Sequence, residues 1–273
     1  KESKITNKYF IFNKENDLTN SFGYKVKEQG LGYSTIFEYN ENIDITTGLN
    51  YKKSDRHSAS VSTKSINDNI GDFDIYTFNM SLIYDSTDDF LYPTDGSLNS
   101  AYIEYSPNEF SDDSYYKIII KNDLYNKLKN SNRFLFLSNR IGMAESLDGK
   151  LKTVNAFSLG GLNFKGFDYR GVGPKQDNRY LGGNKFFTST IGYGGSFLFD
   201  DKDNINTKLF YTVGSIWDSD YTDDNDLELR SSLGLSLDLL TAIGPLSFSY
   251  AIPINKKTND RTNEFNFSIG TSF

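Results

Sequence analysis

The chain has 273 residues, enough for one or two domains, and carries a net charge of −7 with a pI near 4.9. It contains no cysteine, which excludes a disulfide framework, a thiolate metal site and a cysteine nucleophile. The acidic balance disfavours nucleic acid as a partner, because phosphate binding needs a basic face. Aromatic residues make up 15% of the chain, which argues against disorder, and the sequence has no run of about 18 apolar residues that would predict a transmembrane helix.

Apolar and polar residues alternate along most of the chain with a period of two, which a β-strand requires and a helix forbids. The alternation predicts about twelve strands of roughly ten residues, the length that crosses a bilayer when tilted. The opening strand, KYFIF, is partial, and the last three strands are the clearest. In chain order the predicted strands carry their apolar stripes at 8–12, 31–39, 43–49, 76–84, 101–105, 116–124, 135–143, 187–193, 209–213, 227–239, 244–254 and 264–273.

The predicted connections alternate in length. Short turns on one side of a sheet and longer loops on the other are typical of outer-membrane barrels. The link at 86–96 fits this alternation least well. Short links fall near 40–42, 126–132, 200–204 and 241–243, and longer polar ones near 14–22, 54–73, 106–114, 144–185, 218–226 and 255–263.

A soluble β-sandwich also alternates and is the main alternative. Its strands are usually shorter, about five or six residues, and its outer face carries Lys and Glu. Here the second face of the last strands carries Ser, Gly, Ala and Asn, and only 37% of residues are hydrophobic. A membrane barrel has that composition because its lumen is polar and only every second strand residue meets lipid. The sequence therefore predicts an all-β fold, an antiparallel transmembrane β-barrel with a narrow or plugged lumen.

The connection 144–185 is too long to serve only as a link between two strands, since structureless loops beyond about 15 residues are usually functional or disordered. It is rich in glycine, so its backbone can turn tightly and pack closely. It also carries Phe157, Phe164, Phe167 and Tyr169, whose rings need burial. The sequence therefore predicts that this loop folds back into the lumen.

The loop also contains the runs GGLNFKGF (160–167), GVGP (171–174) and LGGN (181–184). Together they resemble the sixth extracellular loop of the BamA family, the central barrels of the outer-membrane β-barrel assembly machine. PTDG (93–96), VGSIW (213–217), GPL (244–246) and the closing FNFSIGTSF (265–273) resemble further family segments. The likeness runs over most of residues 80–273, and the loop runs with their spacing are its most specific part.

The resemblance implies a barrel of sixteen strands preceded by POTRA domains. Matched from the C-terminus, residues 1–273 would be the C-terminal part of that barrel domain, starting near its fifth strand, with the POTRA domains and about four strands outside it. The resemblance also assigns site residues. In the loop they are Phe164, Lys165, Gly166, Phe167, Arg170, Gly173, Pro174, Gly182, Gly183 and Asn184, and on the strand at the seam they are Phe265, Phe267, Ile269, Gly270 and Phe273.

Lys165 stands where the family's loop has an arginine that reaches acidic residues on the inner wall of the next two strands. By register those wall positions are here Gly192 and Thr212, and neither can accept a salt bridge. Two alternatives stay open. Lys165 could pair with a lumen carboxylate such as Asp238, Glu228 or Glu104, or Arg170 could take over the role of the family's arginine.

The resemblance implies an insertase in the Gram-negative outer membrane that helps unfolded outer-membrane proteins fold into the bilayer through a lateral seam. The implied partners are those unfolded proteins, the Bam lipoproteins (mainly through the POTRA domains), lipid and lipopolysaccharide. The alternative is a TamA-like or two-partner-secretion translocation pore of the same superfamily. Residue types alone predict no enzyme, metal or cofactor. The single histidine, His57, cannot build a zinc site or a catalytic relay, and the acidic run at 218–226 lacks the EF-hand spacing.

Overall fold

The computed structural model describes residues 4–59, 61–129, 131–176, 178–196, 205–223, 225–241 and 244–270. Twelve strands form one antiparallel sheet whose neighbours follow chain order, which confirms the predicted strand count. The strands are β1 (Lys4–Leu18), β2 (Tyr24–Glu38), β3 (Ile43–His57), β4 (Gly71–Asp85), β5 (Gly96–Ser106), β6 (Tyr115–Lys127), β7 (Arg133–Ser146), β11 (Lys185–Gly195), β12 (Ile205–Trp217), β13 (Arg230–Thr241), β14 (Gly244–Asn255) and β16 (Phe265–Ile269).

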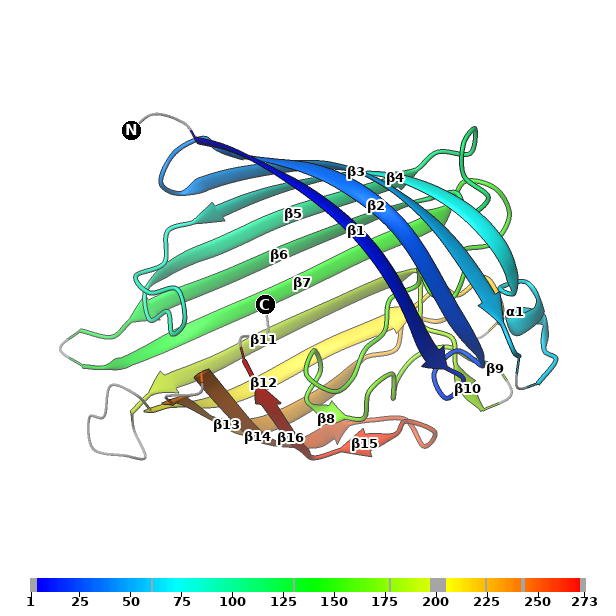
Figure 1. Ribbon diagram of the computed structural model, residues 1–273. Helices are drawn as coiled ribbons and strands as arrows, with labels where there is room; N and C mark the ends of the chain where they lie inside the picture. The colour runs from blue at the N-terminus through cyan, green and yellow to red at the C-terminus, as the bar shows by residue number, and fades with distance from the viewer. Residues whose placement is uncertain are drawn as a thin grey trace.

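The sheet curves around a central space, and the loop between β7 and β11 lies on its concave side (Figure 1). Within the described residues, β1 pairs only with β2 and β16 pairs only with β14, so these two strands are the edges of the sheet. No helix in the described ranges is long and apolar enough to cross a membrane. The connections hold α1 (Lys64–Asn67), β8 (Gly166–Phe167), β9 (Lys175–Gln176), β10 (Arg179–Tyr180) and β15 (Thr262–Asn263); β8 pairs with β15, and β9 with β10.

Most strands are longer than the predicted ten residues. The first seven and β11 to β14 have 11–15 residues, and β1 is a full strand that ends at Leu18. The link after β1 therefore covers only 19–23, so the long loop predicted near 14–22 is wrong. Polar side chains continue this ladder where the apolar stripe stops, as Lys14 does with Glu28 across β1 and β2 at 2.8 Å. Apolar alternation alone does not reveal strand ends whose residues are polar.

The two faces of the sheet differ as the sequence predicts. Outward side chains keep large apolar surfaces exposed, as Leu82 (45%), Ile120 (50%) and Ile191 (60%) do. Inward residues such as Ser232 and Ser236 are polar and buried. A sheet with lipid on one face and a confined interior on the other has this distribution, because only a confined face removes small polar side chains from solvent.

Phenylalanine rings on the inward face lie over glycines of neighbouring strands. Phe12 is opposite Gly30 in the ladder, and Gly192 is opposite both Phe136 and Phe210. A Cβ atom at Gly192 would lie 2.4 Å from the Phe136 ring, so the ring occupies the space that a side chain would need. A ring that covers a cross-strand glycine fills the pleat and shields the backbone. The same arrangement joins Phe10 with Gly32, Phe186 with Gly142, Phe134 with Gly194 and Phe210 with Gly234.

Gly192→Val should destabilise the folded sheet, because the new side chain overlaps the Phe136 ring and overpacking of this kind costs about 1–3 kcal/mol. The measurement is the temperature at which the folded form is lost on a semi-native SDS gel. Ile191→Val, the outward neighbour on the same strand, is the control and should change this temperature little. Equal heat resistance of the two variants would contradict the packing role of Gly192.

Candidate functional site

The loop between β7 and β11 packs onto the inward face of the sheet, as the sequence predicts. Its apolar side chains form a buried cluster with Tyr115 of β6, Ala144 of β7 and Ile216 of β12. Burial of these side chains drives the loop inward and keeps it there. The loop members of the cluster are Leu151, Phe157, Leu159, Phe164, Phe167 and Val172.

The centre of the loop motif is a pair of stacked rings. Phe164 and Phe167 are 1% and 0% exposed, with ring centroids 4.8 Å apart and planes at 9°. Gly166 lies between them with φ +95°, and its missing Cβ would sit 3.0 Å from Cβ of Ser232 and 3.4 Å from the carbonyl oxygen of Ala251. A larger residue would be strained in this conformation and would push the loop away from β13 and β14.

Lys165 forms no ion pair within the described residues. Its ammonium lies 5.2 Å from the centroid of the Phe210 ring, a cation–π contact. Burial lowers the pKa of Lys165, and the negative charge of Asp238 opposes this shift. Asp238 itself pairs with Lys208 at 2.9 Å and accepts a hydrogen bond from Ser247 at 2.6 Å. The other two candidate carboxylates also have other partners: Glu228 pairs with Arg230 and Lys257, and Glu104 accepts hydrogen bonds from Tyr102 and Tyr115.

Gly192 and Thr212 both lie on the inward face, as their register predicts, but neither carries the contact to Lys165. The Thr212 hydroxyl lies 2.9 Å from that of Thr190 on the neighbouring strand. Phe210, opposite Gly192, is the wall residue that contacts the lysine, and it is not among the residues predicted from the sequence. An inward phenylalanine flanked by glycines on both neighbouring strands was the signal that could have identified it.

Arg170 points away from that wall. It is 4% exposed with φ +50°, and its guanidinium lies 4.1 Å from the centroid of the Phe22 ring, in the turn between β1 and β2. One guanidinium nitrogen donates to the Tyr180 carbonyl oxygen at 2.9 Å, and no ion pair of Arg170 occurs among the described residues. Arg170 therefore ties the loop to the opposite part of the sheet and does not replace the family's wall contact.

Gly173 and Pro174 begin the return leg of the loop. A Cβ atom at Gly173 would lie 2.6 Å from a methyl group of Ile216, so this stretch also depends on close approach to the wall. The Pro174 carbonyl oxygen accepts a hydrogen bond from the Leu181 amide at 2.9 Å. This bond closes the short β9–β10 hairpin and directs the chain back toward β11.

Gly182, Gly183 and Asn184 complete the return leg. Gly183 exchanges two backbone hydrogen bonds with Phe157, at 2.9 and 3.1 Å, which join the two ends of the loop. A Cβ atom at Gly182 would lie 2.2 Å from the Phe157 carbonyl oxygen. The backbone N–H of Asn184 donates to the backbone carbonyl oxygen of Asp218 at 2.7 Å, so the loop ends beside the start of the β12–β13 connection.

A buried ion pair holds the first part of the loop, and it is not predicted from the sequence. Arg56 of β3 pairs with Asp113 at 2.7 Å, and their side chains are 1% and 4% exposed. The side-chain amide of Asn155, in the loop, donates to both carboxylate oxygens of Asp113 at 3.1 Å. The three residues lie in separate segments of the chain, so no local pattern connects them.

The last strand presents its apolar residues outward. Phe265, Phe267 and Ile269 are about half exposed or more. Gly270 has φ +93°, and its amide donates to the Pro245 carbonyl oxygen at 2.8 Å. Phe273, the remaining residue assigned to this strand, lies outside the described residues.

The Omp85 superfamily domain matches residues 1–273, the whole of the chain. The chain belongs to the Omp85 superfamily. Its relatives include the outer membrane protein assembly factor BamA of Neisseria meningitidis serogroup B, 30% identical over 51% of this chain and 22% of that protein. BamA of Nitratidesulfovibrio vulgaris is 24% identical over 69% of this chain and 24% of its own length. The chain thus spans about a quarter of the length of these relatives.

Solved structures show the same fold. BamA from Haemophilus ducreyi lacking POTRA domains 1–3 superposes with a TM-score of 0.84 at 22% identity, covering 97% of this chain and 58% of that one. CdiB from Escherichia coli gives a TM-score of 0.55 at 12% identity, covering 97% of this chain and 48% of that one. At these identities the likeness concerns the fold alone.

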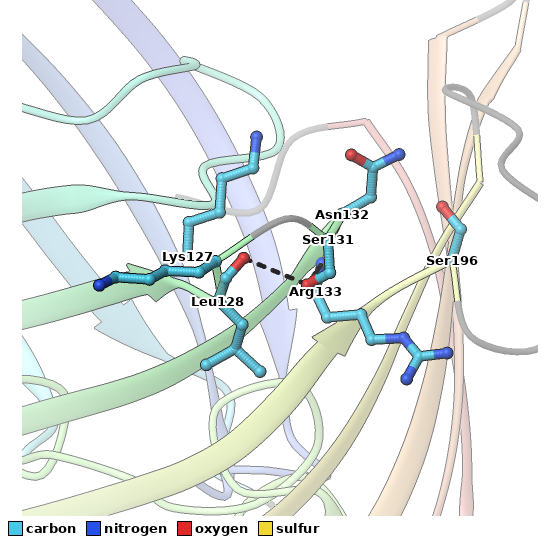
Figure 2. Close-up of a pocket in the computed structure, with 7 residues that line it drawn as sticks. Lys127, Leu128, Ser131, Asn132, Arg133 and Ser196 are labelled. Atoms are coloured by element: carbon cyan, nitrogen blue, oxygen red, sulfur yellow. Dashed lines mark hydrogen bonds between the residues drawn. The ribbon is translucent and has the colours of Figure 1, made fainter.

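A polar hollow of about 870 Å³ lies at the turn between β6 and β7 of this Omp85 domain (Figure 2). Lys127, Ser131 and Arg133 line it, and the turn is closed by its own hydrogen bonds, such as the Leu128 amide to the Arg133 carbonyl at 2.8 Å. Its charged residues are exposed, and none of the predicted site residues lies there. No group of three or more metal-ligating side chains occurs in the described part of the chain.

Phe210→Leu should loosen the loop of this Omp85 domain at Lys165, because the ring that the ammonium faces is lost while an apolar side chain remains. A partly desolvated cation–π contact contributes about 1–2 kcal/mol. Tryptic cleavage after Lys165 should therefore become several-fold faster, provided that cleavage follows local opening.

Phe136→Leu is the matched control, since it removes the ring that lies over Gly192 and leaves the lysine contact in place. Cleavage after Lys165 that is equally slow in both variants would show that the Phe210 ring does not hold the loop.

Proposed function

We propose that this protein is an outer-membrane protein insertase of the Gram-negative cell. It accepts unfolded β-barrel proteins and helps them fold into the bilayer through a lateral seam next to its last strand. The two curated relatives carry the name of an outer-membrane assembly factor, which supports this proposal. The observation that carries it is the edge strand β16, which faces lipid with apolar residues and pairs on one side only within the described residues.

Backbone pairing supplies the physical reason for such a function. An unfolded strand that enters lipid carries unsatisfied N–H and C=O groups, each of which costs several kcal/mol without a partner. An edge strand offers the complementary row of groups, so an incoming strand can add to it. No covalent chemistry is needed, and we propose that the protein is not an enzyme and needs no cofactor.

The residues that we propose for each part of this function are those assigned from the sequence. The loop residues around Phe164–Lys165–Gly166–Phe167 brace the inner wall, and residues 264–273 form one side of the seam. Gly270 weakens pairing there, because it has no side chain to pack against the neighbouring strand. Residues 1–273 act as the C-terminal part of a longer barrel domain. The partners are unfolded outer-membrane proteins, Bam lipoproteins, lipid and lipopolysaccharide. A TamA-like or two-partner-secretion pore has less support, since both curated relatives are assembly factors.

Phe167→Ala should impair assembly in cells that depend on this protein. Truncation of the fully buried ring removes its stack on Phe164 and costs about 3–5 kcal/mol of packing, so the loop should leave the wall. The measurement is the amount of folded outer-membrane proteins, by heat-modifiability on gels, after depletion of the wild-type copy.

Tyr169→Ala is the control, because that side chain is 58% exposed two residues further along the same loop. The Phe167 variant must itself reach the membrane as a folded barrel for the comparison to count. Normal levels of folded outer-membrane proteins with a folded Phe167→Ala variant would argue against the insertase role of the loop.

A further inference from the structure

The end of the chain is divided between two pairing partners. β16 pairs with β14, whereas β15, just before it, pairs with β8 of the long loop. Only Glu264 separates β15 from β16, so one nearly continuous extended segment leaves the wall and joins the loop. Figure 1 shows β15 beside β8, on the way into β16.

A proline explains why the ladder on β14 stops. The Ala251 amide donates to the Glu264 carbonyl oxygen at 2.8 Å, so this amide points toward the last strand. Every second amide of an antiparallel strand points to the same neighbour, and the next donor on this edge would belong to residue 253. That residue is Pro253, which has no N–H. A register shift between Ser231 and Ser232, opposite this part of β14, disturbs the other edge as well.

The long loop supplies the hydrogen bonds that β14 cannot. The Asp168 amide donates to the Arg261 carbonyl at 2.9 Å, and the Arg261 amide donates to the Gly171 carbonyl at 2.9 Å. The Tyr180 hydroxyl accepts from the Arg261 amide at 3.1 Å and donates to the Asn259 carbonyl at 2.6 Å. These bonds and the β8–β15 pairs together form a loop clasp.

The segment that the loop clasp holds is also attached to the sheet at Asp260, just before Arg261. Arg230, the first residue of β13, makes a two-pronged ion pair with Asp260 at 3.0 and 3.2 Å, and both side chains are buried. The ion pair of Arg261 with Asp168, at 3.4 Å, is exposed and contributes little. Backbone bonds and the Tyr180 hydroxyl therefore provide most of the hold on residues 261–263.

We propose that the long loop is the pairing partner of the first part of the last strand, and that it thereby sets how firmly the seam strand is held. Tyr180 and the Arg261 backbone are the positioning groups. When the loop lifts from the wall, β15 loses its partner and β14 cannot replace it at Pro253, so β16 frays from that end. The assignment of β16 to a seam rests on the proposed function, whereas the coupling between loop and strand does not.

Hydrogen–deuterium exchange on the full-length protein in lipid nanodiscs tests the coupling. Arg261→Pro removes the amide that serves both Gly171 and Tyr180. Peptides covering 262–270 should then exchange about fivefold to tenfold faster, the size expected when one or two backbone hydrogen bonds are lost. Thr258→Pro is the matched control, because no hydrogen bond of that amide occurs among the described residues, and it should leave these peptides unchanged.

Tyr180→Phe keeps the backbone intact and should accelerate the same peptides in the same direction by a smaller factor, which covers the case that the proline variant does not fold. Peptides of β13 report on the fold as a whole and should not change. Identical exchange of 262–270 in wild type, Tyr180→Phe and a folded Arg261→Pro would overturn the coupling. No substrate protein is present, so this outcome is independent of whether the protein is an insertase.

Discussion

The seating of residues 164–167 on β13 and β14 is the contact on which the rest of the interior depends. The stacked rings of Phe164 and Phe167 are buried there, away from water. Burial of each ring contributes about 1.5–3 kcal/mol to the stability of the fold. Gly166 allows this because nothing projects from its backbone toward Ser232. Once this stretch is seated, Lys165 reaches Phe210 and β8 comes within pairing distance of β15. If residues 164–167 lay elsewhere, their packing on β13 and β14, the contact of Lys165 with Phe210 and the β8–β15 pairs would all be lost together.

At the centre of the loop, Lys165 faces an aromatic ring, where the family resemblance implies an arginine that contacts carboxylates. A lysine ammonium is a compact, strongly hydrated charge and lacks the planar fork with which arginine binds a carboxylate. An aromatic ring can hold a lysine without such a fork, and the Phe210 ring has room because it lies over Gly234, which has no side chain. Asp238 adds a favourable field without touching the lysine. Glycine on the wall therefore acts by admitting the ring that the cation faces.

Period-two alternation was enough to predict the strands and their faces, because lipid imposes the same demand on every outward residue. It failed at the strand ends, where Lys14 and Glu28 pair across the ladder and no apolar stripe marks them. The loop motif predicted which residues, such as Gly166 and Phe167, lie on the wall. It could not predict Phe210, or the pair of Arg56 with Asp113, because such contacts join segments distant in sequence, and only the folded chain brings them together.

The division of the last strand follows from one rule about backbone groups. An N–H or C=O that leaves water must find a partner, and the partner need not belong to the neighbouring wall strand. Pro253 removes a donor from the edge of β14, so the segment before β16 satisfies its groups on the loop instead. The loop is folded by ring burial, and the last strand is in part folded by the loop. Because Pro253 offers no donor, the loop on the inward face also serves as a pairing partner for the segment that leads into the edge strand.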